Sequence, residues 1–225
     1  MPADVTGVYS SSSNTLTFSS LSISVANGSN ETYTISAYYA TNSSLTENQT
    51  FVLSLDGDTD LTVSSTGTQM SGANASLSNG TGSTVAIIAT QLLLTTPPAD
   101  TRVVDTNDEV LSGSSFLTQP VVIARDAALN IDSDFVDLVQ ASISSGSGTL
   151  AGTTSAAAAA GTATFSTLRY DASADGETLI LSFDDQSSGA EGNLGAVASA
   201  SLSADVVATQ WVFSRQPVGY FWRFW

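Results

Sequence analysis

The chain has 225 residues, of which 21 are acidic and 5 basic, and its formal net charge is −16. This excess of negative charge disfavours nucleic acid and anionic membrane surfaces as partners, because both are bound mainly through Lys and Arg. The sequence contains neither Cys nor His, which excludes disulfides, thiol catalysis and imidazole acid–base chemistry. An acidic surface of this kind suits calcium, glycans or solubility in salt.

Short runs of alternating apolar and polar residues fill the first 87 residues. They occur at 21–25, 33–39, 51–55 and 61–63. Alternation of this period places the apolar side chains on one face of a β-strand. Turn-forming groups such as Asn27-Gly28 separate the runs. The pattern predicts a first β-sandwich of about seven strands over residues 1–87.

The same alternation continues at 120–123, 163–165 and 179–183. It predicts a second β-sandwich over residues 88–205, whose first strand is interrupted by Pro97-Pro98. Five consecutive Ala at 156–160 have high helix propensity, but five residues cannot nucleate an isolated helix. We expect them to lead from a loop into a strand. The predicted fold is therefore all-β, with two tandem sandwiches.

Residues 89–98 return, altered, as residues 208–217, at an offset of 119. Both copies begin with Ala-Thr-Gln. A fixed period of this length indicates tandem modules. We therefore expect residues 206–225 to comprise the first strand of an incomplete repeat and an aromatic tail.

The second module contains a recognisable succession of motifs: TQPVVIARD at 118–126, NIDSDF at 130–135, GTLAGT at 148–153 and GTATF at 161–165. This succession, over roughly residues 88–217, resembles the Ig-like repeats of large bacterial and archaeal surface proteins, including invasin-like adhesins. The resemblance implies an Ig-like sandwich with an extracellular, non-enzymatic spacer or adhesive role. Leu129 stands where the family usually has a turn glycine, which predicts a turn of another type.

Carboxylates cluster in this module, and an Asp-rich turn can supply the six to eight oxygens that calcium prefers. Repeats of this kind often rigidify their junctions with calcium, whereas a solvated acidic turn is the alternative interpretation. No other cofactor is expected. The candidate calcium ligands are Asp126, Asn130, Asp132, Asp134 and Asp137.

Six N-glycosylation sequons lie in the first module and none in the second. Each Asn could carry a glycan or form a turn. Adjacent Tyr38 and Tyr39 place one ring on each face of a strand, so an exposed Tyr could stack on a sugar. A carbohydrate-binding module is accordingly the alternative function. The sequon residues are Asn27, Asn30, Asn42, Asn48, Asn74 and Asn79.

The C-terminal segment is strongly apolar and aromatic, and it is the predicted site of self-assembly. It could be a scar of cloning or a frameshift, pack on its own sandwich, or insert into another subunit as an added strand. The last alternative gives head-to-tail filaments. Residues 1–4 are not a signal peptide, so we expect a removed signal or an internal fragment, and no run is long enough to span a membrane. The assembly residues are Val206, Val207, Trp211, Phe213, Phe221, Trp222, Phe224 and Trp225.

The sequence thus predicts an extracellular structural or adhesive protein of the cell surface that lacks catalysis. A Ser nucleophile would have neither a His nor a Lys base, because the chain contains neither residue. The expected partners are other copies of the chain or adjacent repeats, with glycans as a further class.

Overall fold

The computed structural model describes residues 5–21, 23–36, 44–63, 76–104, 107–186, 191–212 and 214–215. Within these ranges the chain is all-β, as the alternation predicts, with seventeen strands and no helix. These residues accordingly include no helix long and apolar enough to cross a membrane. The chain divides into two compact units, residues 1–40 and 41–225.

The first unit contains one antiparallel hairpin, β1 (Val8–Ser10) with β2 (Thr15–Thr17). The strands predicted at 21–25 and 33–39 do not form in their described parts, where Ile23 and Ile35 remain exposed. Alternation creates an apolar face, but a strand also needs backbone partners and a second layer to cover that face. The described residues of this unit supply neither.

The described residues of 44–84, in the second unit, form two short antiparallel pairs of strands. Strand β3 (Thr50–Phe51) pairs with β6 (Ser83–Thr84), and β4 (Ser54–Leu55) pairs with β5 (Leu77–Ser78). The run at 51–55 is thus split between two strands, and 61–63 is not a strand. Among the described residues, buried apolar side chains begin at Val85. The first sandwich over 1–87 therefore stays a prediction.

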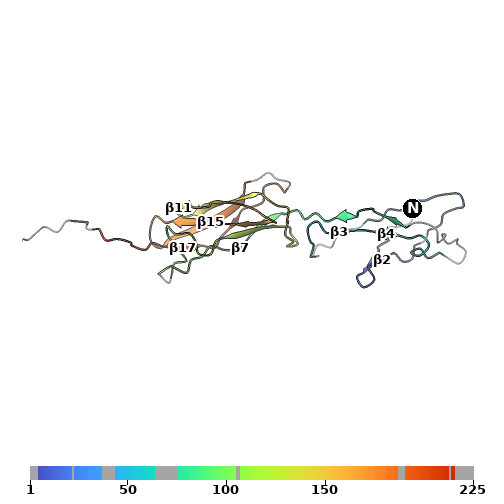
Figure 1. The fold of residues 1–225 in the computed structure, drawn as a ribbon, viewed down its shortest axis with the longest axis horizontal. Helices are drawn as coiled ribbons and strands as arrows, with labels where there is room; N and C mark the ends of the chain where they lie inside the picture. Colours follow the sequence, from blue (N-terminus) through green and yellow to red (C-terminus); the bar gives the residue numbers. More distant parts are fainter. Residues whose placement is uncertain are drawn as a thin grey trace, which may run out of the picture. The chain divides into compact units, whose positions relative to one another are not determined.

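Residues 85–205 are organised as two sheets around one core (Figure 1). The smaller sheet has the order β13-β9-β7 and the larger one β12-β10-β15-β17-β8, with β16 also paired to β15 and β11 paired separately with β14. All pairs are antiparallel except β17–β8, which is parallel. The strands are β7 (Gln91–Thr96), β8 (Val110–Leu111), β9 (Val121–Arg125), β10 (Leu138–Ser145), β11 (Thr149–Ala151), β12 (Ser155–Ala157), β13 (Thr162–Thr164), β14 (Arg169–Asp171), β15 (Glu177–Asp185), β16 (Val197–Ala198) and β17 (Leu202–Asp205).

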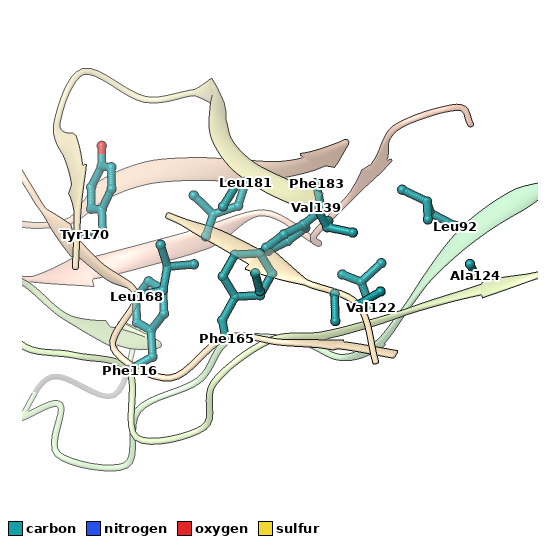
Figure 2. Close-up of a cluster of buried hydrophobic side chains, with 14 of the residues drawn as sticks. Leu92, Phe116, Val122, Ala124, Val139, Phe165, Leu168, Tyr170, Leu181 and Phe183 are labelled. Carbon is teal, nitrogen blue, oxygen red and sulfur yellow. The ribbon is translucent and has the colours of Figure 1, made fainter. Parts of the chain in front are cut away.

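The core fills the space between the two sheets, where Figure 2 shows apolar side chains from both layers. Strand β9 contributes Val122 and Ala124, and β15 contributes Leu181 and Phe183. Phe183 meets Phe165 edge to face, with ring centroids 5.4 Å apart, a favourable geometry for two aromatic rings. Alternate residues of each strand therefore bury one face, and this confirms the predicted strands at 120–123, 163–165 and 179–183.

The alanine run forms no helix, as predicted, but it begins within a strand and ends in a turn, and is not a passage from a loop into a strand. The proline pair ends a strand, as predicted. Residues 155–157 form β12, Ala160 has a φ of 50°, and no helix forms between them. Strand β7 ends at Thr96, directly before Pro97, because proline cannot donate a backbone hydrogen bond to a sheet.

Leu129 lies in the turn after β9 and has a φ of 74°. This left-handed conformation is the one for which glycine is the usual residue. The turn is closed by a hydrogen bond from the Leu129 amide to the Asp126 carbonyl, 3.2 Å long. Leu129 thus takes the glycine's conformation itself, and the expected change of turn type is not needed.

Candidate functional site

The five predicted calcium ligands do not form one site. Asp126 and Asn130 bond to each other across the turn: the Asn130 amide reaches Asp126 Oδ1 at 2.8 Å, and Asn130 Nδ2 reaches Oδ2 at 2.9 Å. Burial of the Asp126 carboxyl opposes ionisation, but these hydrogen bonds outweigh it and hold the pKa of Asp126 below its ordinary value. Both carboxylate oxygens of Asp126 already accept hydrogen bonds, so this pair of residues stabilises the turn.

Asp132 and Asp134 instead join Glu47, and one carboxylate oxygen from each lies within 4.8 Å of the others. Asp132 is fully buried. It accepts hydrogen bonds from the amides of Ala89 at 2.8 Å and Phe135 at 3.1 Å. Glu47 accepts one from the Ile87 amide at 2.8 Å. The group therefore fixes the segment that leads into β7.

The neighbouring negative charges change the pKa of Asp134, the exposed member of this group. A hydrogen bond with Asp132, some loss of solvation, and the charges of Asp132, Glu47 and Glu191 raise the pKa of Asp134 to about 6. An oxygen-rich group of this kind can hold a proton or a hard cation. Sequence analysis missed Glu47, because it lies far from Asp132 along the chain and nothing local marks it.

Asp137, the fifth predicted ligand, lies apart from both groups beside Asp185. One oxygen of each carboxylate, Oδ2, is buried and has no hydrogen-bond partner. Burial is the main cause that raises the pKa of Asp185, and the nearby charges of Asp184 and Asp137 add to it. The sequence prediction did not include Asp185.

A second carboxylate group, also missed from the sequence, lies where the chain leaves the sandwich. Oxygens of Asp108, Asp175 and Asp205 come within 4.8 Å of one another. Asp205 accepts from the Val104 amide at 2.6 Å, and Asp175 accepts from the Val206 amide at 2.9 Å. These bonds anchor the start of the C-terminal segment to the module before it.

The predicted assembly segment begins directly after Asp205. Its described residues 206–212 form no strand within the single chain, and the predicted extra strand, which was expected to be unpaired there, stays a prediction. The physical reason that no strand forms is the lack of a neighbouring strand to complete its backbone hydrogen bonds. Val206 and Val207 are exposed, and Trp211 is fully exposed. The remaining predicted assembly residues lie outside the described residues: Phe213, Phe221, Trp222, Phe224 and Trp225.

The described sequon residues are all exposed, as glycosylation requires. Two of them also shape turns: Asn48 has a φ of 61°, and Asn79 accepts from the Leu53 amide at 2.9 Å. Glycosylation of Asn27, Asn30, Asn48 and Asn79 stays a prediction. Asn42 and Asn74 lie outside the described residues, as do Tyr38 and Tyr39, on which the carbohydrate-binding alternative depends.

Glu177 is a further polar centre that sequence reasoning missed. Its carboxylate accepts hydrogen bonds from the side chain and amide of Ser147, from the Ser173 amide at 2.7 Å, and from the Tyr170 hydroxyl at 2.8 Å. These donors, Ser147 first, hold the pKa of Glu177 well below its ordinary value. The carboxylate ties two loops to the start of β15.

Comparison of the chain with protein-family models, curated proteins and solved structures gives no significant match.

Proposed function

We propose that this chain belongs to an extracellular structural or adhesive protein built of Ig-like repeats, and that residues 206–213 add as a strand to a module of a second copy. Assembly of this kind links subunits head to tail and produces an open filament.

The strand order of residues 85–205 supports the Ig-like part of the proposal. In an Ig sandwich, the strands B and E share one sheet, and C, F and G share the other. Here β9 pairs with β13 in one sheet, while β10, β15 and β17 are neighbours in the other. The first strand, β7, pairs with β9, as the strand A of an Ig domain pairs with B.

One observation supports the assembly part of the proposal. The same sequence motif occurs twice, once with its large apolar side chain buried and once with that side chain exposed to solvent. Leu92 in β7 is 5% exposed and belongs to the core. Its counterpart at the offset of 119 residues is Trp211, which is fully exposed. A large, fully exposed aromatic side chain on a segment with β-sequence character favours association with a partner.

The sandwich offers places at which such a strand can add. In the described part of the chain, β13 and β7 are the outermost strands of the smaller sheet, and β12 and β8 are those of the larger sheet. A strand at a sheet edge presents backbone donors and acceptors along its outer side, where another strand can pair. Backbone pairing would supply affinity, and alternate side chains such as Trp211 would supply specificity.

The test compares the full chain with a variant that ends at Asp205, the last residue of β17. We expect the full chain to sediment as large species and to show fibres by negative stain, and the shortened chain to remain a monomer. Far-ultraviolet circular dichroism must show that the shortened chain retains its β-structure. Fibres from the shortened chain, or a monomeric full chain at the same concentration, would contradict strand addition.

A matched pair of substitutions tests the register. Trp211→Ser removes the counterpart of Leu92, whereas Gln210→Ser changes its neighbour on the opposite face of the strand. Assembly should be lost in the first variant and retained in the second. Equal effects of the two substitutions would mean that hydrophobicity of the tail, and not a strand with two faces, drives association.

A further inference from the structure

Asp137 and Asp185 lie on one face of two paired strands. Asp185 is the last residue of β15 and pairs with Val139 of β10. Directly paired residues point to the same side of a sheet, and so do residues two apart along a strand. Asp137 lies two residues before Val139, so its side chain shares that side with Asp185. Val139 is buried in the core, which places both carboxylates at the end of the core face.

The hydrogen bonding of this pair is incomplete. Asp185 is fully buried, and its Oδ1 accepts from the Leu194 amide at 2.9 Å. Its Oδ2 has no partner, and neither has Oδ2 of Asp137, although both atoms are shielded from water. A buried charge without a partner is strongly unfavourable, and buried carboxylates are normally paired or coordinate a metal. Two such oxygens on the same face of the sheet would both be stabilised by one positively charged group placed between them.

The side chains nearby supply negative charge. The carboxylate of Asp184 acts on Asp185 together with that of Asp137. The chain contains no Lys and only five Arg. Of these, Arg102 and Arg169 are engaged with Asp100 and Asp171. Arg125 has a buried Nε without a partner, but it ends β9 in the opposite sheet and follows the core residue Ala124, so it lies on the face of that sheet away from the core. A soluble cation is therefore the partner that best fits this pair.

We propose that Asp137 and Asp185 bind a structural calcium ion through their buried Oδ2 atoms. Oxygen donors favour a hard divalent cation, and calcium tolerates irregular coordination, with carbonyl groups or water as further ligands. The ion would connect the start of β10, the end of β15 and, through the Leu194 bond, the segment that follows. This site is separate from the group formed by Glu47, Asp132 and Asp134, and it does not depend on strand addition.

The experiment measures thermal unfolding of the full chain in calcium and in EDTA, with calcium stoichiometry from titration calorimetry. At a calcium concentration a hundredfold above Kd, binding to the folded state alone should raise Tm by about 5–10 °C. Asp185→Asn should abolish this shift and remove one calcium ion from the measured stoichiometry. Asp137→Asn should do the same, and it serves as the second variant if Asp185→Asn fails to fold.

Asp184→Asn is the matched control, because it removes the same charge from the adjacent residue on the opposite face of β15. It should retain both the shift and the stoichiometry. The proposal is overturned if the wild-type chain shows no calcium-dependent shift, or if Asp137→Asn leaves the shift and stoichiometry unchanged. A shift in Tm that follows pH but not calcium would also overturn it, because that result assigns the site to a shared proton.

Discussion

Substitution of Leu129 tests whether the backbone is strained at this turn. The left-handed conformation of Leu129 costs an L-amino acid about 1–2 kcal/mol. Replacement by glycine removes this strain, but it also removes side-chain contacts and makes the unfolded chain more flexible. A second leucine separates these effects. Leu117 is 57% exposed against 62% for Leu129, and it does not have a positive φ.

Leu117→Gly and Leu129→Gly should therefore lose similar contacts and gain similar freedom in the unfolded state. Only Leu129→Gly relieves left-handed strain. We expect it to be more stable than Leu117→Gly by about 1–2 kcal/mol. Urea unfolding of the full chain, followed by circular dichroism, measures this difference if the m-values agree. Equal loss of stability in the two variants would refute the assignment of strain to Leu129.

Three further predictions concern the core and two carboxylates. Phe183→Ala removes one ring of the edge-to-face pair and should cost about 3–5 kcal/mol in urea unfolding; a loss below about 1 kcal/mol would contradict the packing described. Because the pKa of Glu177 is depressed in the fold, its ionised form stabilises the protein above its ordinary pKa of 4.5, and this stabilisation is lost as the pH falls. The stability difference between wild type and Glu177→Gln should accordingly shrink from pH 7 to pH 3, and a constant difference would contradict it. Because the pKa of Asp134 is raised to about 6, its protonated form stabilises the fold at low pH, and this contribution disappears as the pH rises through 6. In EDTA, Asp134→Asn should therefore raise Tm more at pH 7 than at pH 4, and a lower Tm at pH 7 would disprove the charge crowding.

The strands β9, β13 and β15 could be predicted because each buries one face in a shared core. In β15, for example, Leu179, Leu181 and Phe183 are buried, and the sequence shows the same alternation. The runs at 21–25 and 33–39 alternate equally well but remain unpaired where they are described. Alternation records which face a strand could bury, whereas pairing depends on residues elsewhere in the chain.

The candidate sites were less predictable, for a related reason. The hydrogen-bonded pair of Asp126 and Asn130 is local, and its turn could be predicted from the sequence. Glu47 reaches Asp132, and Asp185 reaches Asp137, only because the fold brings distant segments together. Sequence proximity therefore grouped five residues that the structure divides among three environments. Local spacing identifies metal ligands only when all of them lie on one loop, as in an EF-hand.

The bond between Ala89 and Asp132 bears on how the repeated segment can associate. Asp132 Oδ2 receives the Ala89 amide at 2.8 Å, so the place of the first strand in this module is already filled. Ala208 repeats Ala89 at the offset of 119 residues. An incoming segment could therefore take that place only by displacing residues 89–96, which requires the core around Leu92 to open. Addition outside an edge strand avoids this cost, and it is the route that leaves the module intact.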